Sequence, residues 1–265
     1  MPGQRLRLLS CNIQAGSSTQ RYRDYVARSW SHVLPAGKRD NIAAIAHLCS
    51  EFDIVGLNES DAGSLRSGFT NQTHRIAELA GMPYWSHQPN RRVGRIAHSA
   101  NGLLSRHQPV EVLDYALPGR VGGRGALIAH FDHAGQRLTI AIAHLSLGVR
   151  SRQLQIDYLA ELLAEAQHVV LMGDFNCGPE APEMQRLYRN TRLCPPSSFV
   201  ATFPSWKPMR ALDHILCSAD LLADPPRVHP AGRSDHLGIA LDISIPRREE
   251  AGAPEPKGGA RGIDQ

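Results

Sequence analysis

The chain has 265 residues, of which 42% are hydrophobic, and its formal net charge is only +4. That hydrophobic content is enough to bury a core, and no Pro/Gly-rich linker divides the chain, so we expect one domain over residues 1–246. The charge is mild for a nucleic-acid binder. No stretch approaches the roughly 20 apolar residues of a membrane span, and the amino terminus lacks a signal-peptide pattern. We therefore expect a cytoplasmic protein with no integral membrane association and no obligate protein partner.

The cysteines and the C-terminal residues exclude further classes of protein and of structure. Five cysteines, at positions 11, 49, 177, 194 and 217, are odd in number and show no C-x-x-C spacing. This argues against a disulfide framework and against a structural zinc site, so we expect free thiols. Residues 247–265 are rich in Gly, Pro and charge and almost free of large apolar side chains. Because such a segment cannot offset its ordering entropy by burial, we expect a disordered C-terminal tail.

Hydrophobic periodicity predicts helices and strands in alternation along the chain. In chain order we expect a strand at 5–11, a helix at 38–52, a strand at 53–57, a strand from about 126, a strand through 138–142, a helix at 152–167, and strands at 168–172, 212–216 and 239–245. Alternation within 212–216 places His214 on the sheet face opposite to Asp213, which favours a packing role for this histidine.

The most informative segment is Gly173-Asp174-Phe175-Asn176, which follows a helix and a short apolar strand. An acid and an amide two residues apart at the end of a strand present oxygen atoms that suit a metal ion or a phosphate. Asp and Asn favour turns, which would explain one such tetrad by itself. The pattern recurs, however, because polar residues lie beside other predicted strands: Asn12, Glu59, His144, Asp213, Asp235 and His236. In α/β sheets, ligand groups gather where strands end.

These residues belong to an ordered set of short motifs that carries a family resemblance: Ser10-Cys11-Asn12, Gly56-Leu57-Asn58-Glu59, Ala100-Asn101-Gly102-Leu103-Leu104-Ser105-Arg106, Ala143-His144-Leu145, Gly173-Asp174-Phe175-Asn176, Leu212-Asp213-His214-Ile215 and Ser234-Asp235-His236. The set resembles the endonuclease/exonuclease/phosphatase superfamily of deoxyribonuclease I-like, metal-dependent phosphoesterases. The resemblance implies an α/β (α+β) fold, a four-layer αββα sandwich of two packed mixed β-sheets flanked by helices. Asn58 departs from the Gln that members often have before the metal-binding Glu. This departure, with the absence of a nearby Lys, makes the abasic-site repair enzymes less favoured.

The resemblance implies a role for each site residue. Mg²⁺ or Mn²⁺ would be held by three residues: Asn12, Glu59 and Asp235. The catalytic group would comprise five others: His144, Asp174, Asn176, Asp213 and His236. Asp213 would fix the tautomer of His236 and favour its cationic form. Two alternatives stay open at this point: whether Asp174 or the Asp213–His236 pair activates water, and whether one or two metal ions act.

Substrate contacts are expected from Asn101, Arg95 and Arg124. Loop arginines are usually solvated, but as a group those at positions 21, 23, 91, 92, 95, 120 and 124 favour a phosphate-bearing substrate. Phe203 and Trp206 would either anchor their own loop or stack on a base.

The first functional hypothesis is a nuclease acting on DNA or RNA. The alternative is a phosphoesterase of a smaller substrate, such as a phospholipid head group or an inositol phosphate. A non-catalytic binding module is disfavoured, since it would not need Glu59, Asp174, Asp213 and His236 together.

Overall fold

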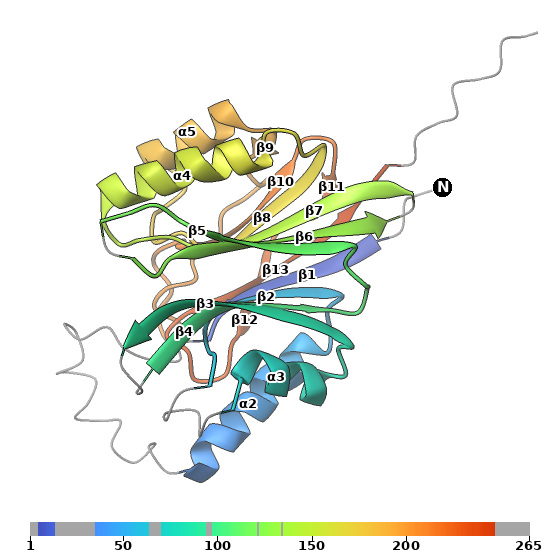
Figure 1. The fold of residues 1–265 in the computed structure, drawn as a ribbon, viewed down its shortest axis with the longest axis vertical. Helices are drawn as coiled ribbons and strands as arrows, with labels where there is room; N and C mark the ends of the chain where they lie inside the picture. Colours follow the sequence, from blue (N-terminus) through green and yellow to red (C-terminus); the bar gives the residue numbers. More distant parts are fainter. Residues whose placement is uncertain are drawn as a thin grey trace, which may run out of the picture.

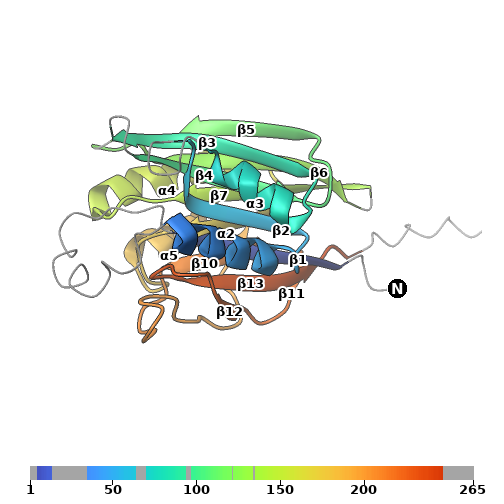
Figure 2. The same ribbon diagram turned by 90° about the horizontal axis from the view of Figure 1, so that it is seen from below.

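The computed structural model describes residues 5–13, 35–63, 70–93, 97–120, 122–133 and 135–246. Two β-sheets pack face to face, and a pair of helices covers the outer face of each sheet (Figure 1). The view from below in Figure 2 shows one of these helix pairs lying across its sheet. This arrangement confirms the predicted four-layer sandwich. The tail predicted at 247–265 lies outside the described residues.

The first sheet is mixed and has the strand order β11-β13-β1-β2-β4-β3, with β12 also paired to β13. Only β1 and β2 pair in parallel within it. Its strands are β1 (Arg5–Asn12), β2 (Ile54–Asp61), β3 (Tyr84–Val93), β4 (Ala97–Ser105), β11 (Leu222–Ala223), β12 (Arg227–Pro230) and β13 (Leu237–Ser244).

The second sheet has the order β5-β6-β7-β8-β10-β9, with β7 and β8 as its parallel pair. Its strands are β5 (Glu111–Ala116), β6 (Gly125–His133), β7 (Gln136–His144), β8 (His168–Asp174), β9 (Leu193–Cys194) and β10 (Asp213–Ser218). The last residue of β1 is in register with Asn58, and the last residue of β7 is in register with Asp174. Across the interface β1 contacts β8 and β10, and β2 contacts β7 and β8. The ends of both parallel pairs meet, because Asn12 and Asn58 are hydrogen-bonded to Asp174.

Helices α2 (Pro35–Cys49) and α3 (Gln72–Ala80) cover the first sheet, and α4 (Val149–Leu163) and α5 (Pro182–Asn190) cover the second (Figure 1). Three apolar clusters fill the spaces between the layers. One lies between the two sheets, and one lies between each sheet and its helices. The five cysteines are free, as predicted. Among the described residues, no helix combines the length and the hydropathy that crossing a membrane requires.

The predicted elements match those observed with shifted ends. The helices predicted at 38–52 and 152–167 begin and end about three residues earlier, as α2 and α4. Strands β2 and β8 run on into the polar motifs that were expected to follow them, so Glu59 and Asp174 are strand residues. His214 faces away from the site as predicted, since its Nε2 lies 2.9 Å from the carbonyl oxygen of Cys177. Helices α3 and α5 were not predicted, nor were strands β3, β4, β5, β9, β11 and β12.

Candidate active site

Glu59 lies at an irregularity in β2. The pairing of β2 with β4 shifts between Leu57 and Ser60, which marks a β-bulge. Glu59 has a left-handed φ of 58° within it, a conformation that is uncommon for residues other than glycine. A bulge re-aims side chains. It leaves the Glu59 side chain 27% exposed, whereas the preceding Asn58 is fully buried.

Asp174 is held by hydrogen bonds from three directions. Its backbone N–H donates to Asn58 Oδ1 at 2.9 Å. Its carboxylate accepts from the Asn12 side chain at 3.0 Å and from the backbone N–H of Asn176 at 2.9 Å. Asn12 and Asn58 belong to the first sheet, whereas Asp174 belongs to the second. The orientation of this buried carboxylate is therefore set across the interface between the sheets.

Gly173 permits the close approach of strands at this point. Its φ is 142°, and a Cβ there would lie 1.9 Å from the carbonyl oxygen of Ala143. No L side chain fits at this distance, so glycine is required next to Asp174.

His144 ends β7 beside two carboxylates. Its Nε2 lies 3.5 Å from Asp174 Oδ2 and 3.8 Å from Glu59 Oε1. Burial lowers the pKa of His144 well below its usual value, and the positive charges of Arg124 and His236 lower it further. His144 is therefore neutral at pH 7 despite its acidic neighbours, because desolvation outweighs their attraction.

Asp213 and His236 form a buried pair. Asp213 begins β10, and its Oδ2 accepts a hydrogen bond from His236 Nδ1 at 2.7 Å. Burial alone would lower the pKa of His236, but the bond to Asp213 and the charges of Asp213, Asp174 and Asp235 raise it to about 9. His236 is thus a cation at neutral pH. Its Nε2 faces Asp174 Oδ2 at 4.0 Å.

The pKa of Asp174 balances these influences. Burial and the neighbouring charge of Asp213 raise it to about 7, while His236 and the backbone N–H of Asn176 act in the opposite direction. A carboxylate with such a pKa can exchange protons at neutral pH.

Asn176 and Asp235 are the remaining residues predicted to belong to the site. Asn176 has a left-handed φ of 54°, and its amide donates to the carbonyl oxygen of Leu145 at 2.9 Å. One amide hydrogen is used in this way, and an amide carries two. Asp235 Oδ1 lies 4.0 Å from His236 Nε2. Burial is the main cause that raises the pKa of Asp235, against the opposing effect of His236.

The donor atoms suit Mg²⁺ or Mn²⁺, which prefer carboxylate and amide oxygens. Glu59 presents a partly exposed carboxylate beside the buried Asp174. The ligand atoms of Asp174, Asp213 and His236 also lie within 4.8 Å of one another. Asp213 Oδ1 is buried and lacks a hydrogen-bond partner among the residues that the structure describes. Because the pKa of His236 is raised to about 9, its ring is protonated and poorly suited to ligate a cation, so the oxygen donors form the better set.

The expected substrate contacts have different outcomes. Arg124 lies close enough for its charge to lower the pKa of His144, so it borders the site. Asn101 is fully buried, and its amide bonds to Asn58, to Gln88 and to the backbone of Gly125. The expectation that Asn101 contacts substrate is corrected, because its polar atoms serve the protein interior. Arg95 lies outside the described residues.

A loop beside His236 supplies a contact that the sequence left open. The Phe203 ring lies 4.9 Å from the His236 ring, between centroids. The loop is attached to the segment that carries His236, since Ser205 donates hydrogen bonds to the carbonyl oxygens of Asp235 and Ser234. Phe203 therefore packs against the imidazole, whereas Trp206, in the same loop, is 63% exposed.

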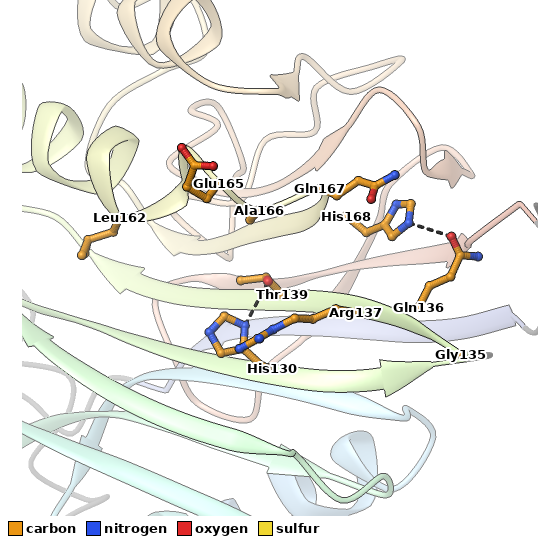
Figure 3. Close-up of a pocket in the computed structure, with 10 residues that line it drawn as sticks. All are labelled: His130, Gly135, Gln136, Arg137, Thr139, Leu162, Glu165, Ala166, Gln167 and His168. Carbon is orange, nitrogen blue, oxygen red and sulfur yellow. Dashed lines mark hydrogen bonds between the residues drawn. The ribbon is translucent and has the colours of Figure 1, made fainter.

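A cavity of about 470 Å³ lies far from these residues, at the beginning of β7 (Figure 3). Its polar side chains have partners nearby: His168 Nε2 lies 2.9 Å from Gln136 Oε1, and His130 Nδ1 lies 3.0 Å from Thr139 Oγ1. We place the active site at the other end of β7, because the carboxylates and histidines converge there.

Comparisons with known proteins agree with this geometry. A structure of an endonuclease/exonuclease/phosphatase from Beutenbergia cavernae is similar, with a TM-score of 0.70 and 20% identity over 91% of this chain and 72% of the other. A mannosyl-6-phosphatase from Bacteroides thetaiotaomicron has a TM-score of 0.65 and 18% identity over 91% and 100% of the two chains. Beta toxin from Staphylococcus aureus has a TM-score of 0.63 and 15% identity over 89% and 99%.

A search of curated proteins finds no match. The family model described as Endonuclease/Exonuclease/phosphatase family matches residues 9–236, a span that begins in β1 and ends at His236. This span contains both sheets' contributions to the site. The chain therefore belongs to the endonuclease/exonuclease/phosphatase family and is a phosphoesterase of that family.

Proposed function

We propose that the protein is a Mg²⁺- or Mn²⁺-dependent phosphodiesterase that acts on nucleic acid. One observation carries the proposal. Two carboxylates from different sheets, Glu59 and Asp174, flank the neutral His144, and the cationic His236 faces Asp174. Hydrolysis of a phosphodiester anion requires neutralisation of its oxygens, alignment of a water molecule and stabilisation of the leaving oxygen. The arrangement supplies a group for each task.

Glu59 and Asn12 would hold the metal ion, with Asp174 and Asp235 close by. When bound, the ion would neutralise charge on a non-bridging phosphate oxygen. The second amide hydrogen of Asn176 and the ring of His144 would donate to the phosphate. Asn176 is held in place by its bond to the Leu145 carbonyl oxygen, and burial restricts the motion of the His144 ring.

Asp174 is our candidate for the group that orients the attacking water and accepts its proton. Its pKa of about 7 suits a general base at neutral pH. His236 does not suit that task, because its pKa of about 9 keeps it protonated. As a cation held by Asp213, it would stabilise the phosphate and the charge that develops on the leaving oxygen.

The rim of the site supports a nucleic-acid substrate. Arg124 brings positive charge to the side of His144, and Trp206 presents a largely exposed ring three residues after Phe203, which packs on His236. Aromatic rings stack on bases, and arginines attract the phosphate backbone. Together they favour a strand of nucleic acid over a small anion.

A substrate panel tests the proposal. The purified protein, with Mg²⁺ or Mn²⁺, would be offered single- and double-stranded DNA and RNA, bis-p-nitrophenyl phosphate, phospholipids, inositol phosphates and a sugar phosphate. We expect nucleic acid to be cleaved fastest and Glu59→Gln and Asp174→Asn to lose the activity. If a lipid or a small phosphomonoester is hydrolysed faster, and the same variants lose that activity, the proposed site would be supported and the proposed substrate would be wrong.

A further inference from the structure

Three buried amide side chains form a hydrogen-bonded chain inside the first sheet. Asn58 Nδ2 donates to Asn101 Oδ1 at 2.9 Å, and Asn101 Nδ2 donates to Gln88 Oε1 at 3.1 Å. The residues lie on the neighbouring strands β2, β4 and β3, and each is at most 5% exposed. We call them the amide chain. Buried amides are costly unless their hydrogen bonds are made, so the remaining donors and acceptors need partners.

Those partners are backbone groups of the second sheet. The bonds of the amide chain across the interface are Asp174 N–H to Asn58 Oδ1 at 2.9 Å, Asn58 Nδ2 to the Ala143 carbonyl at 3.4 Å, Asn101 Nδ2 to the Gly125 carbonyl at 2.8 Å and Gln88 Nε2 to the Tyr115 carbonyl at 3.0 Å. They reach β8, β7, β6 and β5 in turn. The amide chain thus connects the two sheets at several points along one line.

The backbone of the second sheet leaves room for these amides. A Cβ at Gly125 would lie 2.3 Å from Gln88 Oε1, and one at Gly173 would lie 3.0 Å from Asn58 Oδ1. The same Cβ would lie 2.4 Å from Asn90 Oδ1, so a larger residue at Gly125 is excluded unless both Gln88 and Asn90 move. Both glycines are therefore matched to the amides that face them.

We propose that the amide chain is a positioning device that sets the spacing of the two sheets at the active site. Asn58 is its functional end. It precedes Glu59 in the bulge of β2 and binds the backbone of Asp174 on β8. A shift of Asn58 relative to β8 therefore changes the distance between Glu59, the proposed metal ligand, and Asp174, the proposed base beside it. This inference rests on the proposed function of the site.

The arrangement distinguishes positioning from simple stabilisation. An apolar core would hold the sheets together without fixing their register, because apolar contacts are not directional. Hydrogen bonds to particular backbone carbonyl oxygens do fix this register, and hydrogen bonds connected in a network act as a unit. Gln88 contacts neither carboxylate of the site, so its effect on the chemistry must pass through Asn101 and Asn58.

The test compares variants of the amide chain with a matched control. Asn101→Leu removes the central amide at similar volume, and Gln88→Met removes the distal amide and keeps the length of the side chain. Ser218→Ala is the control, because Ser218 is equally buried and its hydroxyl accepts from Val169 N–H at 3.0 Å near the start of β8. If Asn101→Leu does not fold, Gln88→Met carries the test.

Three quantities are measured: hydrogen exchange of the Asp174 backbone amide in metal-free protein, Mn²⁺ affinity by electron paramagnetic resonance, and kcat. We expect both amide-chain variants to lose protection at Asp174 and to lose about 10- to 100-fold in Mn²⁺ affinity and kcat, as for removal of residues that orient metal ligands. Ser218→Ala should lower the melting temperature and leave affinity and kcat within about twofold.

The two proposals fail separately. Unchanged Asp174 protection and Mn²⁺ affinity in both amide-chain variants, with a melting temperature as low as that of Ser218→Ala, would reduce the amide chain to ordinary stabilisation. If the wild-type protein neither binds Mn²⁺ nor hydrolyses phosphoesters, the proposed function fails. Loss of Asp174 protection in Gln88→Met would still support the positioning role in that case.

Discussion

The two ends of the parallel pair β7 and β8 carry similar residues in different settings. At the start of β8, His168 bonds to Gln136 and forms an ion pair with Asp220, both in its own neighbourhood. At the end of β7, His144 lies between Asp174 and the Glu59 carboxylate of the opposite sheet. A histidine, an acid and a cavity near one another are therefore not sufficient to identify an active site. The better criterion is that charged groups from both sheets converge at one place.

The pKa shifts also differ between the two ends of β7 and β8. At the site end, burial and neighbouring charges move three groups in different directions: the pKa of His144 falls, that of His236 rises to about 9 and that of Asp174 rises to about 7. At the other end, partial burial and Arg137 lower the pKa of His130, and the charge of Glu111 acts in the opposite direction. Opposed pKa shifts in contact indicate acid-base chemistry.

Metal removal should give the largest effect and bear only on the site end. Because Glu59 and its neighbours offer oxygen ligands, we expect a chelator to abolish hydrolysis and Mg²⁺ or Mn²⁺ to restore it. Glu59→Gln should need about 10- to 100-fold more metal for half-maximal rate, with an unchanged melting temperature. Full activity in metal-free protein, checked by elemental analysis, would contradict metal dependence.

The pair Asp213–His236 should give the next largest effect. Asp213→Asn keeps the shape of the side chain but can stabilise the wrong imidazole tautomer, so we expect a loss of at least about a hundredfold in kcat. Since the two residues act as a unit, removing both should cost little more than the worse single change. Steady-state kinetics of the two single variants and the double variant measure this. Additive losses would mean that the 2.7 Å contact has no catalytic role.

The pH profile of kcat/KM sharpens the electrostatic contrast. Asp174 must be ionised and His236 protonated, so the rate should rise as pH increases through about 7 and fall above about 9. Below the lower pKa and above the higher one, kcat/KM should change about tenfold per pH unit. Asp213 raises both pKa values. Asp213→Asn should therefore move both limbs to lower pH, and limbs that stay in place would show that other groups titrate.

Much of the fold was predictable from local patterns. Hydrophobic patterns located β1, β2, β6, β7, β8, β10 and β13 and both long helices, because these elements bury one face or lie wholly in the core. The motifs of the candidate site were visible because their polar residues lie at the ends of apolar strands. The short helices α3 and α5 were missed, since nine residues give only two and a half turns of pattern.

The rest of the site depends on contacts that no local pattern reveals. Asn101 and Gln88 lie inside strands, and their partners are backbone carbonyls of the other sheet. Their sequence neighbourhood is the same whether they face a ligand or an interior, so the sequence could not distinguish these two cases for Asn101. The bulge at Glu59 is likewise a property of pairing with β4, not of the residues of β2 alone.

A matched pair of substitutions tests the comparison between the two ends of β7 and β8. The substitution at the end far from the candidate site should have the smallest effect on kcat. His144→Gln and His168→Gln change the same residue type near opposite ends of β7 and β8. His144→Gln should reduce kcat at least about a hundredfold, because its ring faces both carboxylates. His168→Gln should leave kcat within about twofold and lower stability by about 1–3 kcal/mol, the cost of disrupting a buried hydrogen bond and ion pair. Kinetics and thermal unfolding of both variants decide the matter. A loss of turnover in His168→Gln equal to that in His144→Gln would mean that the distal cavity takes part in the reaction, and that convergence across the sheets was the wrong criterion for choosing between the two ends.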